Sequence, residues 1–234
     1  MRIAVAQMGC VPADVRANVR RMAELAASAR DEGAEVVAFP ELAVTGYEVE
    51  AVRKDRELWV RPDDGRLDPL RASGVATVVN CAEDTGGERP AITSFVFGAD
   101  GGLVTTYRKQ HLFEHEREVF APGRADGRFA LGGLRFALAT CFDNHFPELV
   151  ARGAADGCAV HLASSLYGTG AGRTELATVY PDIARHGLYV AVANHVGPAG
   201  PWTGCGRSAI HAPGGGLLAE ADGETEGVVV ADVG

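Results

Sequence analysis

Short apolar runs alternate along this chain with segments whose apolar residues recur at helical spacing. Residues 2–7 (RIAVAQ) are typical of a strand, residues 14–30 of a helix that stops at Gly33, and residues 35–39 of a second strand. The alternation continues with expected strands at residues 135–140, 158–164 and 188–194 and an expected helix at residues 174–186. Because this order places helices over sheets, it predicts an α/β fold with layered sheets and helices outside.

The middle and the end of the chain are expected to add antiparallel strands. Residues 74–80, 91–98 and 103–107 are separated by turns rich in Gly and Asp, which predicts three neighbouring antiparallel strands. Residues 48–71 are charged and are expected to be irregular, and residues 208–233 indicate three short strands with glycine turns. Without a repeat, a linker or a low-complexity segment, we expect residues 1–234 to form a single domain.

Charge and cysteine usage narrow the class of protein. A formal net charge of -9 argues against nucleic acid or an anionic membrane surface as a partner. Apolar runs stay well below the ~20 residues of a membrane span, and the opening MRIAVAQMGC turns polar too soon for a secretory signal. The five cysteines are scattered, which favours reduced thiols over a disulfide framework. We therefore expect a cytoplasmic protein.

One cysteine lies where an expected strand ends. In RFALATCFDNHFPEL, residues 135–149, Cys141 follows the apolar run directly and precedes the polar residues Asp143, Asn144 and His145. A lone cysteine is usually a small buried hydrophobe, so position alone does not separate a packing role from a reactive one.

Two other strand ends carry groups that could act with a thiol. Glu41 follows Pro40 in VVAFPELAVTGY, and Lys109 follows an expected strand in TTYRKQHLFEHEREVFAPG. Each has a simple structural interpretation, as a solvated carboxylate or a surface lysine. In layered α/β folds, however, ligand sites collect at such strand ends, so Glu41, Lys109 and Cys141 are expected to converge.

Taken in this order, the three segments resemble the nitrilase superfamily of carbon–nitrogen hydrolases. The resemblance rests on three segments: FPELAVTGY, YRKQHLFEHEREVFAPG and CFDNHFPEL. Four further segments extend it over almost the whole chain: RIAVAQ, DEGAEVVAFPE, VAVANHVG and GRSAIHAPGG. It implies a four-layer αββα sandwich and one carbon–nitrogen hydrolase domain over residues 1–234. It also implies Glu41, Lys109 and Cys141 as the catalytic set.

The chemistry of these residue types agrees with that assignment. A free thiol with a pKa near ~8.5 is mostly protonated at neutral pH, so Cys141 needs a base, for which Glu41 is suited. Lys109 would stabilise the thiolate and then the oxyanion of a tetrahedral intermediate, with the backbone N–H of Phe142 as second donor. Glu41 would pass its proton to the leaving ammonia or amine, and water would hydrolyse the thioester. No metal and no organic cofactor is required.

The resemblance also implies a second glutamate after the lysine. Glu116 lies four residues before Phe120 of FAPG, where the family has a Glu-Arg pair. The interval from Lys109 is seven residues, one shorter than expected, so Glu118 stays an alternative. Either residue would orient Lys109 or the substrate amide rather than transfer protons.

The substrate is expected to be a small amide or N-carbamoyl compound. The run CFDNHFPE lacks the Trp-Glu-Asn that follows the cysteine in true nitrilases, which makes nitrile hydrolysis the alternative. We expect Tyr47, Phe142 and His145 to bind substrate, and Tyr167 and Trp202 either to line the pocket or to pack. A substrate carboxylate would use Arg173 or His145, although the sequence places neither in the pocket.

Other functions remain open at this point. HLFEH matches the H-x-x-E-H signature of inverted zinc peptidases, in which His111 and His115 on a helix would bind zinc and Glu114 would act as base. A papain-like site would need Asn194 and His195, but papain's signature around the cysteine is absent. A non-catalytic binding module is the third alternative. By resemblance, we expect a homodimer or a larger homo-oligomer.

Overall fold

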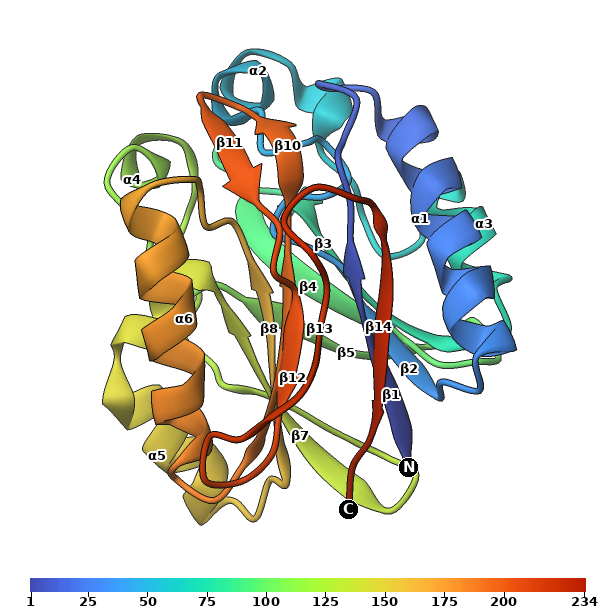
Figure 1. The fold of residues 1–234 in the computed structure, drawn as a ribbon. Helices are drawn as coiled ribbons and strands as arrows, with labels where there is room; N and C mark the ends of the chain where they lie inside the picture. The colour runs from blue at the N-terminus through green and yellow to red at the C-terminus, as the bar shows by residue number, and fades with distance from the viewer.

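Two six-stranded sheets pack face to face, and helices cover both outer faces (Figure 1). The computed structural model describes all 234 residues. Three buried clusters follow from this layering: one between the sheets and one under the helices on each side. The cluster between the sheets joins Ile3 and Val5 of one sheet to Phe136 and Leu162 of the other. The predicted αββα sandwich is confirmed.

The first sheet contains strands from both ends of the chain. Across the sheet, its order is β14 (Gly227–Asp232), β1 (Arg2–Gln7), β2 (Val36–Ala38), β3 (Ala76–Glu83), β4 (Ala91–Phe97) and β5 (Leu103–Arg108). Strands β1, β2 and β3 are parallel, whereas β3, β4 and β5 are antiparallel neighbours, as predicted. Strand β14 pairs antiparallel with β1, so the two chain ends lie side by side (Figure 1).

The second sheet has a parallel centre and antiparallel edges. Its order is β13 (Leu217–Glu220), β12 (Ala209–His211), β9 (Tyr189–Asn194), β8 (Val160–Ser165), β7 (Leu134–Thr140) and β6 (Gly127–Leu131). Strands β7, β8 and β9 are parallel. A separate hairpin is formed by β10 (Val196–Ala199) and β11 (Trp202–Cys205). Together with α2 and α4, this hairpin lies at one end of the sandwich, the upper end in Figure 1.

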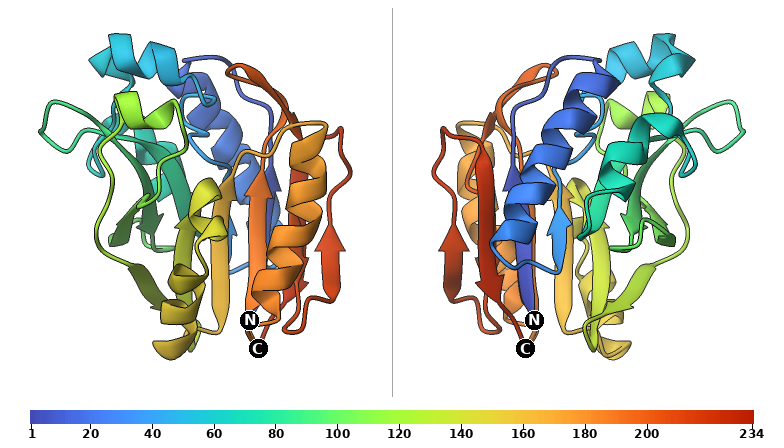
Figure 2. Two further views of the ribbon diagram at one scale, coloured as in Figure 1. Left: turned by 90° about the vertical axis from the view of Figure 1, so that its left-hand side faces the viewer. Right: turned by 90° about the vertical axis from the view of Figure 1, so that its right-hand side faces the viewer.

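Helices are distributed between the two faces and that end. They are α1 (Val15–Asp31), α2 (Val49–Lys54), α3 (Asp68–Arg71), α4 (Glu116–Val119), α5 (Pro147–Ala155) and α6 (Ala171–Ala184), with 3₁₀ turns at Arg56–Leu58, Gly65–Leu67 and Cys141–His145. Figure 2 shows α5 and α6 over the second sheet and α1 and α3 over the first. Helix α1 starts where the Asp14 side chain accepts a hydrogen bond from Ala17 N at 2.9 Å, an N-cap.

Several elements differ from the sequence prediction, the hairpin of β10 and β11 among them. The expected irregular stretch at residues 48–71 holds α2, α3 and two 3₁₀ turns, and α6 begins three residues before its predicted start. Helix α5, which starts with Pro147 in its first turn, was not predicted, and neither was strand β6. In β6 a Cβ on Gly127 would lie 2.6 Å from Tyr107, so glycine is needed there for close packing rather than for a turn. The molecule has no helix of the length and apolarity that a membrane crossing demands.

Candidate active site

Glu41, Lys109 and Cys141 each follow a strand, and the fold brings the three strand exits together. Lys109 comes directly after β5, Cys141 directly after β7, and Glu41 three residues after β2. Strands β2 and β5 belong to the first sheet and β7 to the second, so the site lies where the two sheets meet at one end. The backbone N–H of Glu41 donates to Ser165 O at 3.3 Å, a contact that crosses between the sheets.

Lys109 is held between two glutamates in the interior. Its Nζ donates to Glu41 Oε1 at 2.7 Å and to both carboxylate oxygens of Glu116 at 2.8 and 2.7 Å. All three side chains are 0% exposed. Burial alone would lower the pKa of Lys109, but the two carboxylates outweigh it and raise that pKa, so the ammonium keeps its charge.

Glu41 is the carboxylate of this group with acceptor capacity left. Burial raises its pKa to about 8, while the positive charge of Lys109 opposes that rise and the negative charge of Glu116 adds to it. Its Oε1 accepts from Lys109, and its Oε2 is buried without a hydrogen-bond partner. The Cys141 thiol lies close enough to lower the pKa of this carboxyl. Glu41 can therefore take a proton from a neighbouring group.

Cys141 begins a 3₁₀ turn with its backbone in the left-handed region, at a φ of 44°. This conformation costs roughly 1–2 kcal/mol for a residue with a Cβ, and it turns the chain sharply out of β7. Burial and the nearby Glu41 raise the pKa of the thiol well above its ordinary value, and Lys109 works in the opposite direction. The thiol is therefore neutral at rest, and its nucleophilicity depends on a base.

Glu116, and not Glu118, meets Lys109. Besides the lysine, Glu116 accepts from the Tyr47 hydroxyl at 2.6 Å and from Phe113 N at 2.7 Å. Glu118 lies on the exposed side of α4. The interval of seven residues from Lys109 thus suffices to bring Glu116 to the lysine, because α4 begins at Glu116 itself.

Asp143 joins the cysteine turn to the loop that follows Lys109. Its buried carboxylate accepts from Thr140 N at 3.1 Å, within a capping box that starts the 3₁₀ turn. It also accepts from the Tyr107 hydroxyl at 2.7 Å and from the backbone N–H groups of Gln110 and His111 at 3.2 and 2.8 Å. The relative positions of Cys141 and Lys109 are thereby fixed through one side chain.

Cys141 lies in the wall of a pocket of about 160 Å³. Eight other residues line this pocket: Tyr47, Phe113, Phe142, His145, Leu166, Tyr167, Glu175 and Trp202. The structure thus brings Tyr47, Phe142 and His145, the three predicted substrate-binding residues, to the same cavity. His145 Nε2 lies 3.2 Å from the Tyr167 hydroxyl and 3.3 Å from Glu175 Oε1.

Sequence reasoning missed three residues of this pocket wall, Phe113, Leu166 and Glu175. Phe113 lies inside a quoted segment but carries no signal of its own. Glu175 lies in the second turn of α6, a helix predicted from apolar spacing alone, and only its contact with His145 reveals its position. Arg173, expected as a partner for a substrate carboxylate, does not line this pocket.

The segment behind the zinc alternative does not form a helix. His111 stacks on Phe146, with ring centroids 3.5 Å apart, and its Nδ1 lies 3.1 Å from Asp143. His115 packs edge-on against Tyr47 and Phe113 instead. No three His, Cys, Asp or Glu side chains of the chain come together as a set of metal ligands. The geometry required for His111, Glu114 and His115 is therefore not met.

Asn194 and His195, the residues of the papain-like alternative, support the backbone. His195 Nε2 lies 2.6 Å from the Glu41 carbonyl oxygen, and burial lowers the pKa of His195 to about 4, so the ring is neutral and donates. Asn194 Oδ1 accepts from Tyr167 N at 2.7 Å. Both side chains brace segments that carry the site rather than face Cys141.

The sequence matches a family of known proteins over almost its full length. A family model described as carbon-nitrogen hydrolase matches residues 2–234. Among characterised proteins, the chain is 27% identical to an omega-amidase of Danio rerio, covering 99% of this chain and 87% of that protein. It is 25% identical to the 2-oxoglutaramate amidase of Bacillus subtilis, with 92% and 84% covered.

Solved structures show the same architecture. The chain superposes on the amidase of Nesterenkonia sp. AN1, from the nitrilase superfamily, with a TM-score of 0.91 and 29% sequence identity, covering 100% of this chain and 92% of that one. One structure of a variant of that amidase has the acetamide moiety of fluoroacetamide covalently added at the active-site cysteine. Another variant of it is in complex with butyramide.

Proposed function

The chain belongs to the carbon–nitrogen hydrolase family, and we propose that it hydrolyses the C–N bond of small amides through a thioester on Cys141. One observation carries the proposal. In the wall of a small pocket, Cys141 lies beside a buried carboxylate with a free oxygen, Glu41, which is paired with a buried lysine, Lys109. These are a nucleophile, its base and a fixed positive charge in one place.

In the first half-reaction, Glu41 accepts the proton of the Cys141 thiol as the sulfur attacks the amide carbon. The carbonyl π electrons move to oxygen, and the Lys109 ammonium stabilises the resulting oxyanion, with the Phe142 N–H as second donor. When the intermediate collapses, the C–N bond breaks and Glu41 passes its proton to the departing nitrogen. Glu116 orients Lys109 and stays outside the proton transfers.

In the second half-reaction, water takes the place of the released ammonia or amine. Glu41 removes a proton from this water as its oxygen attacks the thioester carbon, and Lys109 stabilises a second oxyanion. Collapse breaks the C–S bond, and the sulfur recovers a proton from Glu41. The balance is one amide and one water consumed, and one carboxylic acid and one ammonia or amine formed.

The pocket supports a small substrate. At about 160 Å³ it is smaller than the roughly 300 Å³ at which pockets begin to hold drug-sized ligands. The binding of butyramide by a variant of the Nesterenkonia amidase is consistent with this size. N-carbamoyl compounds and nitriles also have an electrophilic carbon bonded to nitrogen and belong in the same screen.

The test is an ammonia-release assay with short aliphatic amides, N-carbamoyl compounds and nitriles. We expect amide turnover that Cys141→Ala abolishes and that Cys205→Ala, a substitution of another buried thiol, leaves in place. Intact-protein mass spectrometry of rapidly quenched wild-type enzyme should show an adduct equal to substrate minus ammonia, located on Cys141. Amide hydrolysis that persists in Cys141→Ala, or an adduct on Cys205, would overturn the assigned nucleophile.

The proposal extends to organisation and location. We treat residues 1–234 as one carbon–nitrogen hydrolase domain that acts in the cytoplasm, where the five free thiols would stay reduced. By resemblance, the protein forms a homodimer or a larger homo-oligomer. The exposed Leu217 and Leu218 on the edge strand β13 are consistent with this, and light scattering after size-exclusion chromatography would measure the mass.

A further inference from the structure

The wall of the catalytic pocket contains no lysine or arginine. Of its nine lining residues, Glu175 alone carries a permanent formal charge, and that charge is negative. The remaining lining is mostly aromatic or aliphatic. A ligand that enters this pocket therefore meets apolar surface and one carboxylate.

The lysine behind the pocket does not compensate for Glu175. Lys109 already contacts two carboxylates through three hydrogen bonds, and none of its donors is left for a substrate anion at rest. Even with Glu41 protonated, Lys109 and Glu116 cancel each other, and the charge of Glu175 remains. The pocket therefore has an excess of negative charge in either protonation state of Glu41.

His145 is the one lining side chain that can become positively charged, and it faces Glu175. Its Nε2 lies 3.3 Å from Glu175 Oε1 and 3.2 Å from the Tyr167 hydroxyl. A proton on this ring would be paired with the glutamate rather than left for a ligand. The contact also restrains the Glu175 carboxylate, whose side chain is 48% exposed, in the pocket wall.

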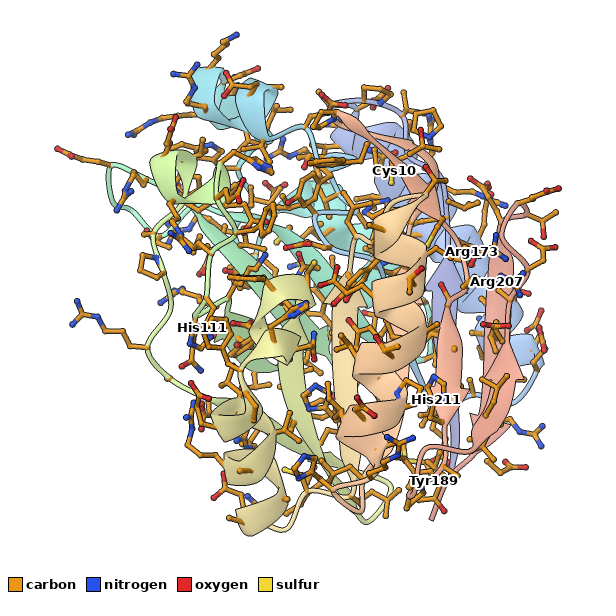
Figure 3. The ribbon with its side chains drawn as sticks, turned by 60° about the vertical axis from the view of Figure 1, so that its left-hand side comes forward. Cys10, His111, Arg173, Tyr189, Arg207 and His211 are labelled. Atoms are coloured by element: carbon orange, nitrogen blue, oxygen red, sulfur yellow. The ribbon has the colours of Figure 1, made fainter.

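Arg173, the nearest arginine in sequence, serves a different cleft. It lines a hollow of about 390 Å³ between α6 and the edge of the second sheet, together with Arg207, His211 and Glu220. Figure 3 shows Arg173 beside Arg207 at one end of α6, with His211 farther along the same cleft. Its guanidinium is therefore not among the groups that a substrate in the catalytic pocket would contact.

We propose that this pocket selects small amides whose acyl chain is uncharged or positively charged, and that Glu175 is the lining residue that contributes to discrimination against a carboxylate. The inference rests on the proposed amide hydrolysis and adds the substrate class. It separates this chain from relatives such as the 2-oxoglutaramate amidase of Bacillus subtilis, which is named for an amide that carries a carboxylate. Like charges placed together without an intervening cation are a recognised way of rejecting a ligand.

The test compares amides of equal size and different charge. Succinamide and succinamate have the same number of non-hydrogen atoms, and only the second carries a negative charge; 4-aminobutanamide supplies a positive one. We expect kcat/KM for succinamide to exceed that for succinamate on the order of 100-fold, since several charges act over a few ångströms at an intermediate dielectric. We expect 4-aminobutanamide to be hydrolysed at least as well as butyramide.

Variants of α6 then assign the effect to one residue. Because Glu175 is half exposed and its field is screened, Glu175→Gln should narrow the succinamide-to-succinamate ratio by about fivefold, and Glu175→Arg should narrow it further. The control is Asp182→Asn, which removes an equal charge two turns farther along the same helix, outside the pocket. The succinamide-to-succinamate ratio of kcat/KM in Asp182→Asn should equal that of the wild type.

Binding to Cys141→Ala makes the test independent of turnover. At equal concentration, succinamide should raise the melting temperature of this variant more than succinamate, and the added substitution Glu175→Gln should reduce the difference. Similar kcat/KM for succinamate and succinamide, or equal stabilisation by both, overturns the charge selection while amide hydrolysis stands. If no amide is turned over at all, the proposed function fails, and the binding comparison still decides whether Glu175 discriminates.

Discussion

At the scale of single residues, the protonation state of Glu41 depends on two other buried charged groups, Lys109 and Glu116. In the proposed mechanism, Glu41 has to be a carboxylate to accept the thiol proton, yet burial favours its protonated form and raises its pKa to about 8. Lys109 opposes this effect, and the like charge of Glu116 reinforces it. Glu116 therefore both orients the lysine and sets the pH at which the base becomes available.

The first prediction concerns this pH. In the wild type, kcat/KM should fall as the pH drops through the raised pKa of Glu41, because the protonated form cannot act as base. Glu116→Gln removes a like charge, which lowers the pKa of Glu41, so the acid limb of the kcat/KM profile should move to lower pH while the maximal rate decreases. The control is Glu118→Gln, an exposed position on the same helix α4 whose profile should match the wild type. If the acid limb of the kcat/KM profile lies at the same pH in Glu116→Gln as in the wild type, Glu116 does not influence the pKa of Glu41.

At the scale of elements, one side chain connects the exits of β5 and β7. Asp143 accepts four hydrogen bonds from main-chain and hydroxyl donors, two of them from the loop after Lys109 and one from the residue before Cys141. Without this carboxylate, those donors would be buried and unpaired. The catalytic geometry therefore depends on a residue that does not line the pocket.

The second prediction follows from that connection. Asp143→Asn keeps the shape but turns an NH₂ group toward buried donors, which should lower the free energy of unfolding by about 3 kcal/mol, since hydrogen bonds to a charged group contribute about 1.5–3 kcal/mol each. At a temperature where the variant remains folded, the fold-decrease in kcat should be larger than the fold-change in KM. Urea unfolding and steady-state kinetics measure the two effects. The control is Asp156→Asn, which removes a half-exposed partner of Arg128 and should change the free energy of unfolding by less than about 1 kcal/mol. An equal decrease of this free energy in both variants would argue against the role of Asp143 in joining the exits of β5 and β7.

The sequence predicted most of these elements and could not predict others, for physical reasons. Hydrophobic periodicity found β1 to the residue and α1 to within one, because their faces contact buried layers. It missed the hairpin of β10 and β11, whose Gly- and Pro-containing residues form strands through pairing and not through propensity. For the site, the strand exits led us to expect Glu41, Lys109 and Cys141 to converge, and the resemblance of the three ordered segments to one family singled them out as a set. The sequence could not predict Glu175 as a pocket residue, because its position in the pocket wall depends on how α6 packs.

At the scale of the whole molecule, two buried histidines make stability depend on pH. Burial lowers the pKa values of His161 and His195 to about 4, so both rings are neutral in the fold. His161 Nε2 lies 2.7 Å from Asn144 Oδ1, beneath the cysteine turn, and its Nδ1 is buried without a partner. In the unfolded chain, both rings would titrate near ~6.5.

The third prediction is a loss of stability in weak acid. Between about pH 6.5 and pH 4 the unfolded chain binds protons that the folded protein does not, so the free energy of unfolding should decrease as the pH falls through this window. Each histidine should add a slope of up to about 1.4 kcal/mol per pH unit. Urea unfolding at a series of pH values measures it. His161→Gln should reduce the slope of the free energy of unfolding against pH, and His186→Gln, at an exposed position, should leave it unchanged. The same slope in both variants would mean that His161 does not cause the loss of stability in acid.

The pairing of β1 with β14 has a consequence for the order of synthesis. Strand β1 is synthesised well before β14, and its hydrogen-bonding edge opposite β2 is filled only by β14, from Arg2 opposite Asp232 to Gln7 opposite Gly227. Until β14 pairs with it, this edge presents unpaired N–H and C=O groups on an apolar strand, which is a template for pairing with another chain. This edge of β1 therefore stays open to pairing with other chains until β14 has been made and has docked beside it.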